Sequence, residues 1–212
     1  MANKDLCAVI LAGGKSRRMG SNKALVTIDG RSLIRIVIDR VLPLTRRILV
    51  SADEEDTYRF LGYPVVPDRY RDHGPLAGVH AAMHHEDSPL YLVLACDLPG
   101  VPTRLLENLV LLVEGYDAAI PRSEDGLAHP LCAVYRKSCL PTVEEALEQG
   151  ARKVIATFLD GPLRIRWVTP DQGPFRDSDL ANINTPVDLR TLGRATGRET
   201  SLNSTYSSRL LK

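Results

Sequence analysis

Residues 6–23 read LCAVILAGGKSRRMGSNK, and this stretch decides the fold that the whole sequence predicts. It opens with an unbroken apolar run from Leu6 to Leu11, which is typical of a strand buried on both faces of a parallel sheet. Gly13 and Gly14 end the run and predict a tight loop, which carries four cations and no carboxylate. Because glycine lets backbone N–H groups turn toward a bound anion, the loop predicts a polyphosphate site at the end of the strand.

Two better-known phosphate loops do not fit these residues. A Walker A loop ending in Gly14-Lys15-Ser16 would need glycine at position 9, where the chain has Val9. A dinucleotide fingerprint has the spacing G-x-G-x-x-G, whereas the glycines here are residues 13, 14 and 20. A surface turn whose cations are simply solvated is the competing interpretation that stays open.

Short apolar runs alternate with segments of helical period along the rest of the chain. We expect further strands over residues 48–50, 65–66, 90–96, 118–120, 131–135 and 163–168. We expect helices over residues 33–42 (with Ser32 as the cap), 56–61, 75–85, 102–112, 140–149, 152–159 and 186–192. This alternation predicts an α/β, doubly wound, mostly parallel Rossmann-like sheet with helices on both faces. Ligands of such sheets bind beyond the carboxyl ends of the strands, where the winding reverses.

The length of 212 residues suits one domain, which we place at residues 1–195. Residues 196–212 are rich in Ser and Thr and have no periodic apolar pattern. A segment of this kind cannot bury a core, so we expect a mobile polar C-terminal tail.

The composition limits the classes of partner. Lys and Arg number 27 against 26 Asp and Glu, so the broad cationic surface of a nucleic-acid-binding protein is not expected. No apolar window is long enough for a membrane span, and the first residues do not resemble a signal peptide. The four cysteines form no C-x-x-C pair, which favours buried free thiols in a reducing compartment. We expect a cytoplasmic protein with neither nucleic acid nor membrane as a partner.

A single carboxylate stands out at the end of the second fully apolar run. Asp97 follows residues 90–96, which read LYLVLAC. A carboxylate at the end of a buried strand is costly unless it faces a cleft or a cation. Magnesium prefers oxygen ligands and takes one or two carboxylates plus substrate phosphates, so Asp97 is the expected metal ligand. The competing interpretation is a helix N-cap ahead of Pro102.

The run LAGGKSRRMGSNKA, residues 11–24, is similar to the signature loop of the molybdenum cofactor guanylyltransferase family. That family belongs to the nucleotidyltransferases with a GT-A-like fold, and the resemblance covers about residues 6–192. It implies that Lys23, Arg17 and Asp97 are the catalytic residues, with Arg18 also beside the triphosphate. The nucleotide-binding residues that it implies are Leu11, Ala12, Gly13, Gly14, Lys23, Ser51, Asp68 and Asp97.

Three further segments support the resemblance on the nucleotide side. Asp97-Leu98-Pro99 matches the family's metal-binding D-x-P motif. Asp68, just before the DHGPLAG segment at residues 72–78, matches an aspartate that contacts the nucleotide, although by itself it would equally be an ordinary turn residue. Ser51 departs from the family, which often has asparagine there, but it keeps a hydroxyl for hydrogen bonding.

Two segments resemble the acceptor side of the family's site. His129 lies in the Ala128-His129-Pro130-Leu131 segment, which is similar to a family strand entry. Asn182 and Asn184 lie in NINTP, residues 182–186, where the family's asparagines lie near the metal and the acceptor. The Thr-Pro that ends this segment is also a plain helix start, so local capping competes with a functional role.

The resemblance implies transfer of GMP from GTP to molybdopterin that carries molybdenum, with Mg²⁺ as cofactor. Molybdoenzymes or cofactor-delivery proteins are the protein partners that it suggests. A relative that uses another acceptor or CTP stays open, although such cytidylyltransferases usually read LAAG in the loop. A non-catalytic nucleotide-binding adaptor and a redox enzyme on a Rossmann sheet also stay open, and the missing dinucleotide fingerprint disfavours the redox enzyme.

Histidines at helical spacing invite a metal interpretation. His80 and His84 are four residues apart on an expected helix, and His85 is adjacent. A zinc-protease motif would need glutamate at position 81, where the chain has Ala81, and the sequence offers no obvious third ligand. We therefore expect solvated helix histidines.

Overall fold

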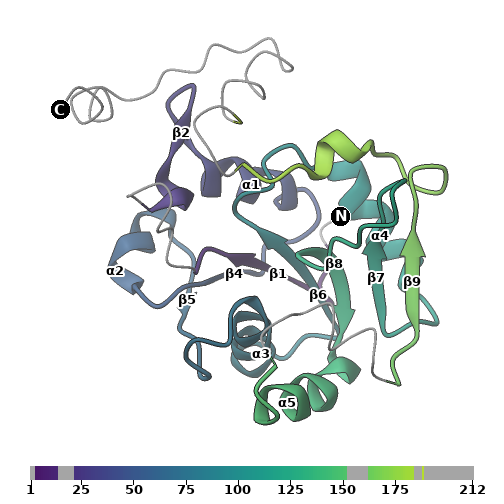
Figure 1. The fold of residues 1–212 in the computed structure, drawn as a ribbon. Helices are drawn as coiled ribbons and strands as arrows, with labels where there is room; N and C mark the ends of the chain where they lie inside the picture. The colour runs from purple at the N-terminus through teal and green to yellow at the C-terminus, as the bar shows by residue number, and fades with distance from the viewer. Residues whose placement is uncertain (1–2, 14–21, 152–161, 184–187, 189–212) are drawn as a thin grey trace.

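The computed structural model describes residues 3–13, 22–151, 162–183 and 188, and Figure 1 shows their arrangement. One seven-stranded sheet runs through the molecule in the order β5-β4-β1-β6-β8-β7-β9. Its strands are β1 (Leu6–Leu11), β4 (Ile48–Ser51), β5 (Val65–Val66), β6 (Leu90–Ala95), β7 (Ala118–Pro121), β8 (Cys132–Arg136) and β9 (Ile165–Val168). Only β8 runs antiparallel to its neighbours, so the expected mostly parallel α/β sheet is confirmed.

Helices cover both faces of this sheet. The longer ones are α1 (Leu33–Val41), α3 (Pro75–His85), α4 (Thr103–Leu112) and α5 (Leu140–Glu148). The short ones are α2 (Glu55–Tyr58) and the 3₁₀ helices η1 (Lys23–Leu25), η2 (Arg59–Leu61), η3 (Lys137–Cys139) and η4 (Asp177–Leu180). Figure 1 shows α3 and α5 together on one side of the sheet, with α1 and α4 on the other.

Strand β1 divides the core into two layers because its side chains alternate between the two faces. Leu6, Ala8 and Ile10 pack in the cluster that includes the apolar residues of α1 and α4. Cys7 and Val9 pack in the cluster under α3 and α5. Every residue of β1 is buried, which explains the unbroken apolar run in the sequence.

A small hairpin was not expected from the sequence. Strands β2 (Thr27–Ile28) and β3 (Arg31–Ser32) pair antiparallel around Asp29 and Gly30, both of which have positive φ. This Asp-Gly pair is the usual signal of a two-residue hairpin turn. Ser32 is the N-cap residue of α1, as expected, but its side chain makes no capping hydrogen bond.

Several expectations concern features beyond the sheet. All four cysteines are buried and free, as expected. The described residues include no helix with the length and apolar character needed to cross a bilayer. The helices expected over residues 152–159 and 186–192 fall outside the described residues except at Asp188, and so does the tail at residues 196–212.

Candidate functional site

The carboxyl ends of three central strands are level with one another. Leu11 at the end of β1 pairs with Ser51 at the end of β4 and with Ala95 at the end of β6. The chain places β4 and β5 on one side of β1 and then crosses to place β6 on the other. The winding therefore reverses between β1 and β6, which is where doubly wound sheets bind their ligands.

Lys23 and Asp97 meet at this edge. The Lys23 ammonium is 2.8 Å from Oδ2 of Asp97, and the two side chains are 13% and 24% exposed. Lys23 follows the glycine-rich loop, and Asp97 follows β6 after Cys96, whose N–H donates to the carbonyl of Leu11 at 3.0 Å. Two residues 74 positions apart thus form one charged pair where β1 and β6 end.

The two ends of the glycine-rich loop are tied to one buried tyrosine. The hydroxyl of Tyr58 donates to the carbonyl of Ala12 at 3.1 Å, and the Asn22 amide donates to the same hydroxyl at 2.9 Å. Asn22 also accepts a hydrogen bond from the N–H of Ala24 at the start of η1. Tyr58 is 2% exposed and therefore fixes the spacing of the loop ends from inside the fold.

Sequence reasoning did not identify Tyr58 as a residue of this site. It lies in α2, far from the loop in sequence, and no motif distinguishes it. Of the residues expected to bind phosphate, Gly14, Arg17 and Arg18 lie outside the described residues. Leu11, Ala12 and Gly13 lie at the end of β1, and the N–H of Ala12 donates to the carbonyl of Ser51 at 2.9 Å.

Ser51 and Asp68 lie together beside the loop. The Ser51 hydroxyl donates a long hydrogen bond of 3.5 Å to Oδ1 of Asp68, and Ser51 is 3% exposed. Gly78 of α3 leaves the room that Ser51 needs, because a Cβ at position 78 would lie 2.3 Å from the Ser51 hydroxyl oxygen. The GPLAG segment thus shapes this side of the site by packing α3 against the end of β4.

Asp68 has an unusual proton affinity for an aspartate. The pKa of Asp68 is raised to about 6, mainly by burial and also by the negative charge of Asp53, while the hydrogen bond from Ser51 partly offsets the rise. A half-buried carboxyl group of this kind can form strong hydrogen bonds with a ligand that supplies N–H or O–H groups.

The antiparallel strand β8 brings a third segment to the same edge. Its amino-terminal end lies beside the carboxyl end of β6, where the N–H of Ala95 donates to the carbonyl of Leu131 at 2.8 Å. His129 precedes this point, and its Nε2 is 2.6 Å from the Ser123 hydroxyl. Burial lowers the pKa of His129, so its imidazole is neutral at pH 7.

The NINTP segment passes directly beside Asp97. The N–H of Ile183 donates to the main-chain carbonyl of Asp97 at 2.9 Å. Asn182 is exposed, and Asn184 lies outside the described residues. Asp97 does not cap α4, because Pro102 is the N-cap residue of that helix. The capping interpretation of Asp97 is therefore wrong.

The surroundings of Asp97 fit a magnesium ion better than a zinc ion. Among the described residues, three side chains of the types that bind zinc lie close enough together to share one ion. Asp97 is not one of them. Asp97 offers a partly exposed carboxylate beside Lys23. Magnesium is held by one or two carboxylates and completes its shell with phosphate oxygens and water, so this donor set is suitable.

The family model of the MobA-like NTP transferase domain matches residues 8–162. The chain belongs to this family. A "probable molybdenum cofactor guanylyltransferase" of Pelotomaculum thermopropionicum is 39% identical over 185 residues, which are 85% of this chain and 88% of the relative. A molybdenum cofactor guanylyltransferase of Shewanella baltica is 34% identical over 90% of this chain and 96% of its own length.

Solved structures agree with the family assignment. The molybdopterin-guanine dinucleotide biosynthesis protein A of Archaeoglobus fulgidus matches with a TM-score of 0.75 and 29% identity, over 90% of this chain and 98% of that protein. A CMP:2-keto-3-deoxy-manno-octonic acid synthetase complexed with CTP matches with a TM-score of 0.73 but only 16% identity, over 92% and 99% of the two chains. The second match shows a shared fold alone.

Proposed function

We propose that this protein transfers GMP from GTP to the terminal phosphate of molybdenum-loaded molybdopterin, which yields molybdopterin guanine dinucleotide and pyrophosphate. The relatives that span most of the chain carry this activity in their names. The observation that carries the proposal is the Lys23–Asp97 pair at the reversal point of the sheet. Lys23, to which we assign phosphate binding, and Asp97, to which we assign metal binding, lie together where β1 and β6 end.

The donor nucleotide binds along the ends of β1 and β4. We assign Leu11, Ala12, Gly13 and Gly14 to the phosphate side of the nucleotide, because glycine lets the backbone approach an anion closely, and we assign Lys23 with Arg17 and Arg18 to neutralising its charge. We assign Ser51 and Asp68, which contact each other, to the nucleoside. Guanine presents N–H donors on the edge that pairs with cytosine, and a carboxylate accepts such groups well. We assign Asp68 to this contact.

The acceptor needs no general base. The second pKa of a phosphate monoester is about 6, so a terminal oxygen of the acceptor is already ionised at neutral pH. That oxygen attacks the α-phosphorus of GTP, a new P–O bond forms, and the bond to the β-phosphate oxygen breaks to release pyrophosphate. The residues at the site therefore act by positioning and by stabilising charge.

Lys23 and Asp97 have different roles in this transfer. The ammonium of Lys23 offsets the negative charge that develops on the triphosphate during transfer. Asp97 would hold Mg²⁺, which when bound neutralises and orients the donor phosphates. Their contact of 2.8 Å holds the two side chains together where β1 and β6 end.

The acceptor side is assigned to the other half of the edge. His129 at the entry to β8, with Asn182 and Asn184, would contact molybdopterin. A neutral His129 that contacts the Ser123 hydroxyl offers a polar group without a charge beside the anionic acceptor. We further propose that residues 1–195 form the catalytic domain, that the protein acts in the cytoplasm, and that a molybdoenzyme or a delivery protein receives the product.

A product assay tests this function. Purified protein is incubated with Mg²⁺ and molybdenum-loaded molybdopterin, with GTP or CTP in separate reactions, while pyrophosphate and dinucleotide are measured. We expect both products with GTP and neither with CTP. Product with CTP alone would overturn the guanine assignment, and GTP binding without pyrophosphate release would identify a nucleotide-binding adaptor instead.

A further inference from the structure

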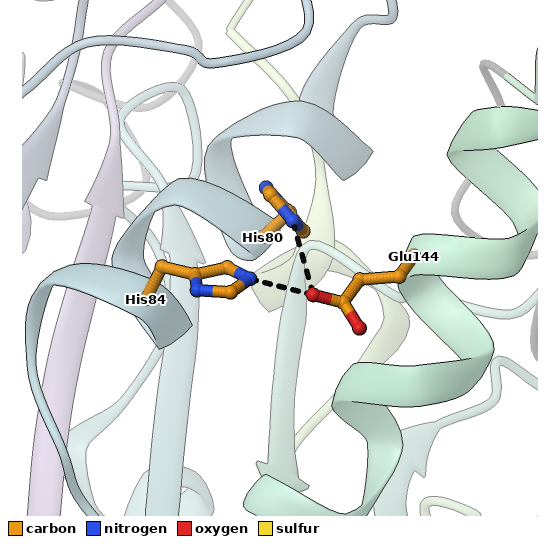
Figure 2. A group of neighbouring side chains, drawn as sticks. All are labelled: His80, His84 and Glu144. Atoms are coloured by element: carbon orange, nitrogen blue, oxygen red, sulfur yellow. Dashed lines mark hydrogen bonds and ion pairs between the residues drawn. The ribbon is translucent and has the colours of Figure 1, made fainter.

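A second polar cluster lies away from the nucleotide edge, between helices α3 and α5 (Figure 2). His80 and His84 project from α3, and Glu144 projects from α5 toward both of them. Nε2 of His84 is 2.7 Å from Oε1 of Glu144, and Nε2 of His80 is 3.8 Å from the same oxygen. The expectation of solvated histidines is wrong for His80, which is only 3% exposed.

The three donor atoms have the spacing of a metal site. All of them lie within 4.8 Å of one another. Zinc bonds to imidazole nitrogen and carboxylate oxygen are about 2.1 Å long, so tetrahedral ligand atoms lie roughly 3.4 Å apart. The contacts of 2.7 and 3.8 Å to Glu144 fall on either side of that spacing. An ion would need only small side-chain shifts to bind all three.

We propose that His80, His84 and Glu144 bind one Zn²⁺ ion, with water in the fourth position, and that this ion clamps α3 to α5. Two imidazoles and one carboxylate are a typical zinc donor set, whereas magnesium prefers oxygen ligands throughout. The site is therefore distinct from the Asp97 site in both place and metal. It does not depend on the proposed transferase activity.

The environment of His80 holds its imidazole in place. The rings of Tyr70 and His80 pack in a T-shaped arrangement with 5.0 Å between their centroids. The His84 and Glu144 side chains are 28% and 38% exposed, so an ion can enter from solvent.

A clamp at this position would act on the donor side of the nucleotide site indirectly. Helix α3 begins at Pro75 and carries Gly78, which packs against Ser51. Helix α5 packs along α3 in the same core layer. Zinc that binds only the folded chain raises its stability in proportion to the logarithm of the zinc concentration over the Kd.

The test is zinc titration of the metal-stripped, full-length protein in millimolar Mg²⁺ and without nucleotide, followed by calorimetry. Excess Mg²⁺ occupies carboxylate sites such as Asp97 but not imidazole sites. We expect one Zn²⁺ per chain and, at a hundredfold excess over the Kd, a thermal midpoint about 5 °C higher. His84→Ala and Glu144→Gln should each weaken zinc binding by at least about tenfold.

Matched controls lie next to each ligand. His85→Ala and Glu145→Gln change neighbouring residues on the same two helices and should leave zinc binding unchanged. His80→Ala is not used because His80 is part of the core. X-ray absorption of the zinc-loaded protein should show nitrogen and oxygen ligands and no sulfur. Absence of zinc binding, sulfur ligands, or equal binding by the wild-type protein and the His84 and Glu144 variants would overturn the proposal and leave a simple hydrogen bond between the helices.

Discussion

The two halves of the nucleotide edge differ in how far their side chains are already held in place. On the donor half, Tyr58 ties the ends of the loop, Ser51 contacts Asp68, and Lys23 contacts Asp97. On the acceptor half, His129 contacts Ser123, while Asn182 is exposed to solvent. Among the described residues, the half that we assign to the donor therefore has more contacts between its side chains than the half that we assign to the acceptor.

The largest expected effect comes from removing the charge of Lys23 or of Asp97. Lys23→Ala and Asp97→Ala should each lower turnover by about 100-fold or more, the scale of one lost electrostatic contact in a transition state. Pyrophosphate release measures this loss, and circular dichroism verifies the fold. Asp171→Asn, which changes an exposed aspartate, is the matched control. Near-normal turnover of a folded Asp97→Ala variant would remove Asp97 from the site.

The next largest effect is expected from adding a methyl group at Gly78, on the half of the edge assigned to the donor. Gly78→Ala would place a methyl group 2.3 Å from the Ser51 hydroxyl oxygen and 3.0 Å from Cδ2 of Leu11, so these side chains or the backbone of α3 must shift. We expect about 1–3 kcal/mol of lost unfolding free energy, together with weaker GTP binding. Denaturant titration and GTP calorimetry measure the two effects. Adding Ser51→Ala should restore part of the stability, and a double variant no better than Gly78→Ala alone would argue against this contact.

The hydrogen bonds from Tyr58 to the two ends of the loop should contribute less to GTP binding. Tyr58→Phe removes the hydroxyl that joins Ala12 to Asn22 while keeping the buried ring. A lost buried hydrogen bond costs about 1 kcal/mol, so we expect about fivefold weaker GTP affinity with a smaller change in kcat. Tyr63→Phe, in a half-buried tyrosine outside this tie, serves as the control. Equal GTP affinity of the Tyr58 variant and the control would show that the Tyr58 hydroxyl is not needed to hold the loop in position.

The last prediction concerns how stability depends on pH. Because the pKa of Asp68 is about 6 when folded, above the ordinary value, its contribution to stability is complete below about pH 4 and lost as the pH rises through 6. Asp68→Asn should therefore match the wild-type protein in thermal stability at pH 4 and exceed it at pH 8. It should also bind GTP more weakly. A stability difference independent of pH would contradict the raised pKa.

The sequence predicted the sheet and the ends of its central strands because both depend on local patterns. The apolar run of β1, the glycines after it and Asp97 after β6 are each visible within a few residues, and parallel pairing brings them to one edge. Partners brought together by packing were not predictable in this way. Tyr58 at the loop ends and Glu144 beside the histidines reach their partners across 36 or more residues, with no motif to mark them.

The central claim is that Lys23 and Asp97 act on the same polyphosphate, and a double-mutant cycle tests it most directly. We would measure kcat/KM for GTP in Lys23→Ala, Asp97→Ala and the double variant, with pyrophosphate release as the readout. Coupled residues in contact should differ from additivity by at least about 1 kcal/mol, so the double loss should be at least about fivefold smaller than the product of the single losses. Single losses that simply multiply would contradict the claim, because they would show two residues that act independently.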